Sequence, residues 1–442
     1  MTKTTTTYTC AHCGYTTPSW MGKCPECDAW NSFGKKEEDN SPHKEKRIKS
    51  KLTKIKDIDH TLQEKTKTAI AEFDRVIGSG ITDGMSILFG GEPGIGKSTL
   101  VLQIAGKYSE IGKKVLYVSG EESPEQISER SARLNINKDN IWMLSESLIP
   151  QIEKAINTTE PNLIIIDSIQ TLVIPEIMSS AGSVLQVREI AFRLNTLAKN
   201  KKIPIIFVGH VTKEGMVAGP KVLEHIVDTV IYLEGDGSNP WRILRPYKNR
   251  FGPTSEIGLF QMTEKGFEEV KNPGMMFLKK KDKELPGAVI TCAIEGGRPL
   301  LLEIQSLVSK SPYSMAKRTV NGVDTNRVSI IAAVLEKKAN VKLFDKDIFI
   351  KIIGGIRIND TALDLAIASA IISSTNNEPF AHNAIIIGEI GLTGEIHPVS
   401  HLDIRLKEIE KLGFKKAIIP NQEISLKTSL DLIKIKTVRE LV

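Results

Sequence analysis

The sequence predicts a mixed α/β fold in which a small cysteine-rich module precedes two larger α/β regions. Two cysteine pairs lie close together before residue 34, short β-branched runs alternate with helical patterns in the middle of the chain, and a second α/β texture follows residue 272. Strands that alternate with helices are typical of a parallel sheet with right-handed crossovers. With 442 residues, 40% of them hydrophobic, the chain can bury more than one core.

Composition divides the chain into four segments. Residues 1–34 hold the cysteine pairs, residues 35–56 form a basic linker, residues 57–272 form the first α/β region, and residues 273–442 form the second. The net charge of +6 permits a nucleic-acid partner without requiring one. The sequence contains neither an apolar run of membrane-spanning length nor the apolar stretch of a secretory signal. We therefore expect a cytoplasmic protein without a membrane partner.

The cysteines indicate a metal site rather than a disulfide framework. Cys10 and Cys13 form one C-x₂-C pair, Cys24 and Cys27 form a second, and Cys292 lies alone in an apolar strand pattern. Two such pairs can supply the thiolates of a tetrahedral Zn²⁺ site, and a module this short needs metal in order to fold. Because protein atoms fill every position, the predicted site is structural. A redox dithiol is the alternative.

Two further features lie near the cysteine module. Trp20 and Trp30 flank the second pair, and we expect them to form the small core of the module rather than a base-stacking platform. A basic run at residues 44–56 could follow DNA phosphates, although such runs are more often solvated linkers.

The first α/β region shows strand and helix patterns in alternation. Residues 113–119, 163–166 and 203–208 are short, β-branched runs of the kind found in buried parallel strands. Residues 98–111 and 184–199 carry apolar residues at helical spacing. The second region repeats this texture, with strand patterns at 287–295, 300–307 and 384–388 and helical patterns at 326–338 and 362–374.

A phosphate-binding loop lies near the start of the first region. Residues 91–99 match G-x-x-x-x-G-K-[ST] in full, and they lie between an apolar strand pattern at 85–89 and a helical pattern. The glycines let backbone N–H groups approach phosphates, Lys97 would reach the β- and γ-phosphates of ATP, and Ser98 would bind Mg²⁺. The predicted nucleotide-binding residues are Gly91, Glu92, Pro93, Gly94, Ile95, Gly96, Lys97, Ser98 and Thr99.

Acidic residues at two strand ends complete the predicted nucleotide site. Asp167 follows the apolar run 163–166 and would hold Mg²⁺ directly or through water. Glu121 and Glu122 follow the run 113–119, where a carboxylate can point at the γ-phosphate. We assign Glu121 as the residue that orients the attacking water. Glu122 is the competing candidate, and a surface acidic pair is the alternative.

Two later segments contain further candidates. His210 and Thr212 close the run 203–208, where either a γ-phosphate sensor or a hydrogen-bonded loop residue would lie. Lys248 and Arg250 lie in a cationic, turn-like segment. They suit contact with the phosphates of DNA or with ATP of a neighbouring subunit, and an exposed cationic turn is the alternative.

These motifs together resemble the bacterial RadA (Sms) family of RecA-like DNA repair and recombination ATPases. The resemblance spans nearly the whole chain and depends on segments 20–27, 91–99, 209–215, 221–229 and, above all, Lys248-Asn249-Arg250-Phe251-Gly252. It implies a RecA-like P-loop ATPase core in a homo-hexameric helicase that acts on single-stranded and branched DNA. It also implies branch migration together with a RecA-type recombinase. ATP would lie between subunits, so Lys248 or Arg250 would act in trans.

Residues 273–442 resemble the α+β proteolytic domain of Lon proteases, which uses a Ser–Lys dyad. In the register from residues 354–355 to Asp364, the nucleophile position falls on Leu363 and the lysine position falls near Asp403. Neither residue can perform that chemistry, and the nearby Thr361 would lack a matched base. We therefore expect a non-proteolytic scaffold for ring assembly and DNA contact.

A DNA-dependent ATPase is thus the leading hypothesis, with three alternatives from other classes. The missing dyad argues against an ATP-dependent protease. The complete set of phosphate loop, Asp167 and Glu121 argues against an adaptor that uses ATP only as a switch. The zinc module and the Lon-like region argue against a replicative DnaB-like helicase.

Overall fold

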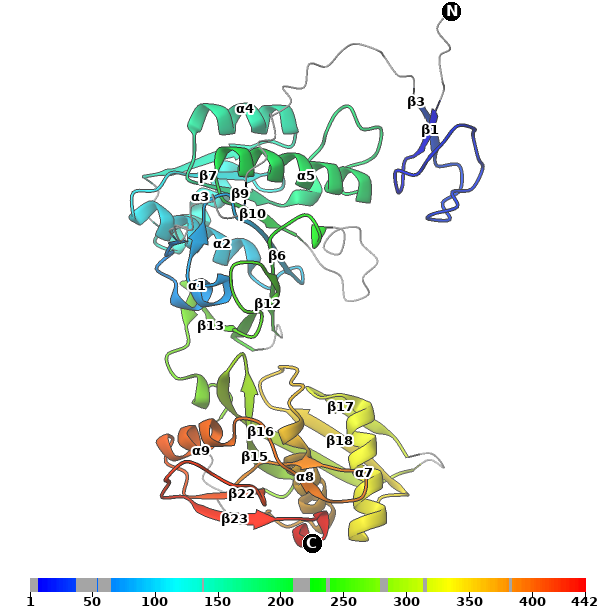
Figure 1. Cartoon of the computed structure of the whole chain (residues 1–442), viewed down its shortest axis with the longest axis vertical. Coiled ribbons are helices and arrows are strands. Elements are labelled where there is room, and N and C mark those ends of the chain that lie inside the picture. Colours follow the sequence, from blue (N-terminus) through cyan, green and yellow to red (C-terminus); the bar gives the residue numbers. More distant parts are fainter. Residues whose placement is uncertain are drawn as a thin grey trace, which may run out of the picture. The chain divides into compact units, whose positions relative to one another are not determined.

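The computed structural model describes residues 7–36, 54, 65–136, 139–209, 223–235, 239–278, 285–312, 316–380 and 384–442 (Figure 1). The chain divides into two compact units. The first comprises Met1–Leu233, Leu244–Thr254 and Glu264–Phe267, and the second comprises Glu234–Ile243, Ser255–Thr263 and Glu268–Val442. The division therefore falls within strands rather than at a single linker. The mixed α/β fold expected from the sequence is confirmed.

The N-terminal module is a small antiparallel sheet with strand order β2-β1-β3. Its strands are β1 (Thr7–Cys10), β2 (Thr16–Thr17) and β3 (Phe33–Lys36). Buried Cys10, Cys24 and Phe33 form its core. The expectation that Trp20 and Trp30 fill this core is wrong, because their side chains are 54% and 72% exposed. The metal-ligand thiols and a single phenyl ring already occupy the interior of so short a module.

A nine-stranded sheet carries the phosphate loop. Its strand order is β14-β13-β12-β11-β6-β10-β9-β7-β8. The strands are β6 (Ser86–Gly91), β7 (Val115–Ser119), β8 (Ile141–Ser145), β9 (Leu163–Asp167), β10 (Ile205–Val208), β11 (Thr229–Glu234), β12 (Trp241–Asn249), β13 (Gly258–Thr263) and β14 (Gly266–Glu269). Strands β11, β6, β10, β9, β7 and β8 pair in parallel. Parallel pairing places the carboxyl ends of these strands at one edge of the sheet.

Helices cover both faces of the parallel strands. They are α1 (Ala71–Ile77), α2 (Lys97–Glu110), α3 (Pro124–Arg133), α4 (Ile149–Thr159) and α5 (Val184–Lys201). Apolar side chains of α4 and α5 pack with Ile164, Ile166 and Phe207 in one core, on the face where Figure 1 draws these helices. Helix α3 begins with a capping box between Ser123 and Gln126, which satisfies free N–H groups of its first turn. Two short strands, β4 (Lys65–Thr66) and β5 (Ile81–Thr82), pair antiparallel, and α1 lies between them in the sequence.

The second unit is built on a seven-stranded sheet with order β17-β18-β16-β15-β19-β22-β23. The strands are β15 (Ala288–Glu295), β16 (Arg298–Lys310), β17 (Arg318–Asn321), β18 (Lys346–Ile352), β19 (Ala384–Ile386), β22 (Lys416–Pro420) and β23 (Asp431–Ile435), and β20 (Glu389–Ile390) pairs with β21 (Ile396–His397) outside this sheet. Helices α7 (Thr325–Ala339) and α8 (Asp364–Asn376) contribute to one core, and α9 (Leu402–Lys411) contributes to another.

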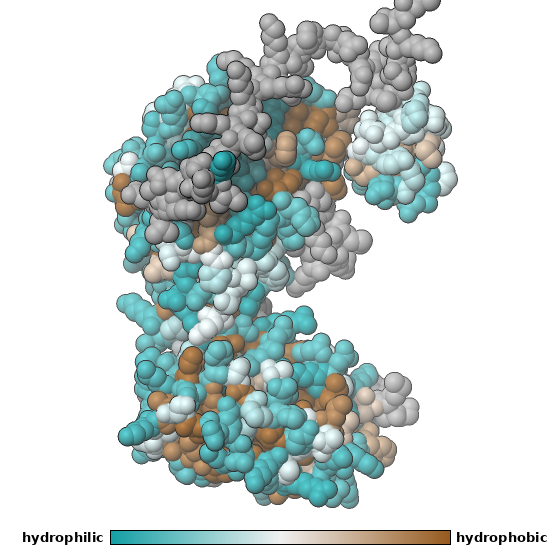
Figure 2. Space-filling model, viewed as in Figure 1, coloured by the Kyte–Doolittle hydropathy of each residue, from teal (hydrophilic) through white to brown (hydrophobic). Residues whose placement is uncertain are grey.

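The surface combines hydrophilic residues with scattered apolar ones, as the visible face in Figure 2 shows. In the second unit, the large apolar side chains of Leu307, Phe344 and Leu392 are 61%, 77% and 72% exposed. None of the helices in the described part of the chain combines the length and the apolar character that a bilayer crossing requires.

Candidate nucleotide and metal sites

The phosphate loop joins the carboxyl end of β6 to the amino end of α2. Gly94 and Gly96 have φ angles of 75° and 109°, a region that residues with a Cβ atom rarely adopt. Helix α2 begins without a side-chain cap, so its first N–H groups are not taken by a capping side chain. Free N–H groups and the positive end of the helix dipole form a suitable place for phosphate.

Lys97 lies inside this loop rather than on the surface. Its side chain is 4% exposed, and its Nζ donates hydrogen bonds to the carbonyl oxygens of Gly91 at 3.0 Å and Glu92 at 2.9 Å. Burial lowers the pKa of Lys97 to about 8, against the opposing effect of the negative charges of Asp167 and Glu121. The loop therefore encloses a cation that two carboxylates stabilise.

Asp167 is the last residue of β9 and lies opposite Ser119, the last residue of β7. The Tyr117 hydroxyl donates a hydrogen bond of 2.6 Å to Asp167 Oδ2, and the Ser98 hydroxyl is a second partner of this carboxylate. Burial raises the pKa of Asp167, although both hydrogen bonds oppose that shift. A carboxylate and a hydroxyl are hard oxygen donors of the kind that Mg²⁺ prefers, so these residues fit the predicted ion.

The two neighbouring glutamates have different partners. Glu121 Oε1 accepts a hydrogen bond of 2.7 Å from the hydroxyl of Ser168, the residue after Asp167. Glu122 instead forms an ion pair with Arg130 of α3. Glu121 therefore lies on the side of the phosphate loop and Asp167, whereas Glu122 is tied to α3. This arrangement favours Glu121 over its competitor.

Lys248 and Arg250 contact the residues that directly precede β11. Lys248 Nζ donates hydrogen bonds to the carbonyl oxygens of Glu224 at 2.6 Å and Val227 at 2.7 Å. Arg250 Nη1 is 3.4 Å from Asp228 Oδ1, and the Arg250 side chain is 60% exposed. Burial lowers the pKa of Lys248, because it disfavours the charged ammonium. Burial also disfavours the charged carboxylate of Asp228.

Lys248 and Arg250 lie at the amino ends of the parallel strands, whereas the phosphate loop lies at their carboxyl ends. Asp228 accepts hydrogen bonds from the N–H of Ser86 at 3.2 Å and from its hydroxyl at 2.8 Å, at the amino end of β6. The phosphate loop follows Gly91, at the carboxyl end of the same strand. At roughly 3.3 Å per residue, the two ends of β6 are about 17 Å apart. The structure thus brings Lys97, Asp167 and Glu121 together but keeps Lys248 and Arg250 away from them.

Asp228 itself is held by a second cation. Lys199 Nζ, in the last turn of α5, is 2.9 Å from Asp228 Oδ1. Burial opposes ionisation of Asp228, but its bonds to Lys199 and Ser86 hold the pKa of this carboxyl below its usual value. His210 and Thr212 lie outside the described residues, as does the basic run 44–56 apart from Lys54.

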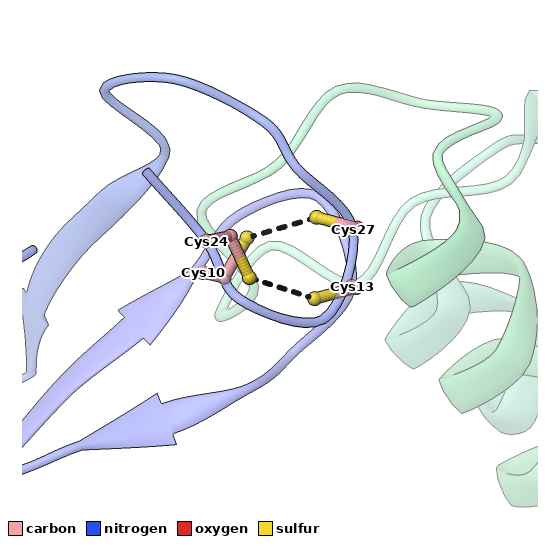
Figure 3. Close-up of side chains that lie close together, drawn as sticks. All are labelled: Cys10, Cys13, Cys24 and Cys27. Atoms are coloured by element: carbon pink, nitrogen blue, oxygen red, sulfur yellow. Dashed lines mark hydrogen bonds between the residues drawn. The ribbon is translucent and has the colours of Figure 1, made fainter. Parts of the chain in front are cut away.

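The four N-terminal cysteines converge on one point (Figure 3). Their sulfur atoms all lie within 4.8 Å of one another, with Cys10 and Cys27 Sγ 3.7 Å apart and Cys13 and Cys24 Sγ 3.5 Å apart. Zn–S bonds of about 2.3 Å in a tetrahedron place the sulfurs about 3.8 Å apart, so the cluster has the size of a Zn²⁺ site.

Two similar turns build this cluster. The Gly14 N–H bonds the Cys10 carbonyl at 2.9 Å, and the Asp28 N–H bonds the Cys24 carbonyl at 3.0 Å. Each turn brings the second cysteine of its pair beside the first. Because both pairs face the same interior point, the arrangement leaves no ligand position for substrate, as expected for a structural site.

The second unit places its predicted dyad positions in unsuitable surroundings. Leu363 is fully buried, and Asp403 lies in the first turn of α9. The Thr361 hydroxyl donates a hydrogen bond of 2.8 Å to Glu389 Oε2, a carboxylate partner that the sequence did not reveal. Since Glu389 is not the lysine of a Ser–Lys dyad, the expectation of an inactive protease fold stands as a prediction.

A buried ion pair lies next to these positions. Arg405 of α9 is fully buried, and its Nη1 is 2.7 Å from Asp360 Oδ2. Asp360 also accepts hydrogen bonds from the Ile294 N–H at 2.7 Å and the Ala362 N–H at 3.0 Å. The pair therefore joins α9, β15 and the turn before α8. No sequence motif indicated it, because its members are 45 positions apart and each resembles an ordinary surface charge.

Comparisons with known protein families match three separate parts of the chain. Residues 8–35 match a rubredoxin metal-binding domain, residues 66–143 and 143–268 match KaiC, and residues 315–423 match subunit ChlI of Mg-chelatase. A solved KaiC-like protein from Pyrococcus horikoshii is similar over 47% of this chain and all of its own, with 21% identity and a TM-score of 0.41.

Relatives similar over their full length share one description. The DNA repair protein RadA of Halalkalibacterium halodurans is 42% identical, covering 100% of this chain and 98% of the relative. That of Bacillus subtilis is 45% identical over 95% and 93%, and that of Helicobacter pylori is 45% identical over 100% and 99%. The resemblance proposed from the sequence is therefore confirmed, together with the zinc ribbon, the KaiC- and RecA-like ATPase core and the ChlI- and Lon-like C-terminal region. The chain belongs to the RadA family of DNA repair proteins.

Proposed function

We propose that this protein is a DNA-dependent ATPase that works as a hexameric helicase and promotes branch migration of recombination intermediates. The observation that carries this proposal is the separation of charges across the nine-stranded sheet. Lys97 and Asp167 lie at one edge, and Lys248 and Arg250 lie at the other. A single copy cannot bring its own Arg250 to its own phosphate loop while the sheet stays intact.

Head-to-tail assembly would bring the two edges together. If the cationic edge of one copy faces the phosphate loop of the next, each nucleotide site gains Lys248 or Arg250 from a neighbour. Such contacts are heterologous, and a repeated heterologous contact closes into a ring when the rotation permits. We propose a homo-hexamer on this basis, in line with the resemblance to RecA-like ring ATPases.

Within each site, the residues would divide the work of phosphoryl transfer. The loop backbone and Lys97 would hold the phosphates of ATP, and Ser98 and Asp167 would hold Mg²⁺. The ion would neutralise charge that develops on the phosphates. Glu121 would orient the attacking water, and a cation from the neighbouring copy would stabilise the transition state.

DNA is the proposed partner of this motor. The relatives from H. halodurans and B. subtilis are described as DNA repair proteins. The net charge of +6 suits contact with phosphates. We propose single-stranded and branched DNA as its substrates and a RecA-type recombinase as its partner. The ChlI- and Lon-like region would serve as a scaffold for the ring and for DNA contact. We propose that the protein works in the cytoplasm.

The decisive experiment measures ATP hydrolysis with and without single-stranded DNA over a range of salt concentrations. We expect DNA to stimulate hydrolysis and salt to weaken the stimulation, because phosphate contacts release counterions. The Lys97→Ala variant is the blank. Hydrolysis that is unchanged by single-stranded and branched DNA at low salt would refute the DNA-dependent activity.

A further inference from the structure

Tyr117 is a buried side chain with a polar group directed at the nucleotide site. It is fully buried in β7, and its hydroxyl donates a hydrogen bond of 2.6 Å to Asp167 Oδ2. The register of the strands explains this contact. Ser119 lies opposite Asp167, and Tyr117 lies two residues earlier on the same face of β7, so its long side chain reaches along the strand to the carboxylate.

The contact occupies one oxygen atom of a carboxylate that has little access to solvent. Asp167 is 8% exposed, and the Tyr117 hydroxyl holds its Oδ2, while the nearby Ser98 hydroxyl lowers its pKa against the opposing effect of burial. A carboxylate without fixed partners can rotate about its last side-chain bond. With Oδ2 held by the Tyr117 hydroxyl, the orientation of the whole group is fixed. Partners of this kind orient metal ligands in proteins.

We propose that Tyr117 is a positioning residue for Mg²⁺: its hydroxyl holds Asp167 so that the carboxylate stays directed to the ion bound beside Ser98. This inference rests on the proposed ATPase function and extends it to a residue that contacts neither nucleotide nor metal. The phenol acts only through Asp167, so its loss affects the Mg²⁺-dependent part of nucleotide binding and leaves the contacts of the loop with the phosphates unchanged.

The test compares Tyr117→Phe with Tyr108→Phe in the full-length protein. Tyr108 of α2 is a matched control because it is also buried, at 2% exposure, and its hydroxyl is influenced by Thr66 and not by Asp167. Binding of fluorescently labelled ADP is measured in EDTA and during a Mg²⁺ titration, and the melting temperature is recorded for each variant. We expect Tyr117→Phe to raise the Mg²⁺ concentration at half-effect by about tenfold or more, the usual cost of losing a partner of a metal ligand.

The outcomes separate this inference from a purely structural role and from the proposed function. A Mg²⁺ titration of Tyr117→Phe that matches the wild type, or an equal shift in Tyr108→Phe, would overturn the inference. So would weaker ADP binding in EDTA, because that result marks general damage to the site. If the wild type shows Mg²⁺-dependent ADP binding but does not hydrolyse ATP, the proposed activity fails while the role of Tyr117 can still be confirmed.

Discussion

The separation of Lys97 and Arg250 leads to a quantitative prediction about mixed assemblies. Lys97→Ala removes the buried cation of the phosphate loop, and Arg250→Ala removes the exposed cation at the opposite edge, about 17 Å away along β6. Each variant alone should lose ATP hydrolysis. If the site forms between copies, a site is complete when an Arg250→Ala copy supplies the loop and a Lys97→Ala copy supplies the arginine.

The size of the recovery follows from counting interfaces. When the two variants are mixed in equal amounts before assembly, half of the loops are intact and half of the neighbouring arginines are intact. About one quarter of the head-to-tail interfaces then hold a complete site. DNA-stimulated hydrolysis of the mixture should therefore approach about a quarter of the wild-type rate at the same total concentration, provided that each site works independently.

A second mixture serves as the control. Lys97 and Glu121 belong to the same edge, so an equal mixture of Lys97→Ala and Glu121→Ala leaves every site with one defect and should stay inactive. Light scattering or native mass spectrometry confirms that both mixtures assemble. Assembled rings without recovery in the first mixture, or with equal recovery in both, would refute the assignment of Arg250 to a neighbouring site.

Three further predictions concern the other regions of the chain. Cys24→Ser should release zinc, measured by elemental analysis, and unfold only the N-terminal module, because Zn²⁺ rather than apolar burial stabilises it; zinc that remains in stoichiometric amount would show that the ligands are assigned wrongly. Asp360→Ala should destabilise the second unit by about 3–5 kcal/mol, because it leaves the buried charge of Arg405 without its partner. Denaturant unfolding measures this loss, and a change below about 1 kcal/mol would show that the pair is not needed. Casein should stay intact in the presence of the protein and ATP, since Leu363 cannot act as a nucleophile; cleavage that Thr361→Ala abolishes would contradict this.

The sequence predicts the local parts of these sites, because the relevant chemistry is contained in short motifs. The phosphate loop, Asp167 at a strand end and the paired cysteines each need only a few consecutive residues and the elements around them. The sequence favours Glu121 over Glu122 only by its position at the strand end, and it does not show what separates the two carboxylates. That difference depends on Ser168 and Arg130, which approach from a different strand and from α3.

Contacts between segments that are distant in the sequence cannot be predicted from short motifs. Trp20 and Trp30 were expected in the core of the zinc module, but both are exposed, because the cysteines and Phe33 leave no room for two indole rings. A tyrosine within an apolar strand predicts only packing, so the sequence alone does not indicate the role of Tyr117. Its function becomes visible once β7 and β9 pair in register and Asp167 lies within reach.

The two cations of the segment from Lys248 to Gly252 differ in a way that bears on mechanism. The Lys248 ammonium already has two carbonyl partners, Glu224 and Val227, so contact with a neighbouring nucleotide would require it to give up both bonds. Arg250 keeps most of its side chain exposed and has one long ionic contact with Asp228. Its planar guanidinium can engage a phosphate through two parallel hydrogen bonds at little cost. We therefore infer that Arg250 reaches the neighbouring site, whereas Lys248 fastens the residues before β11 to β12 and so sets the position from which Arg250 acts.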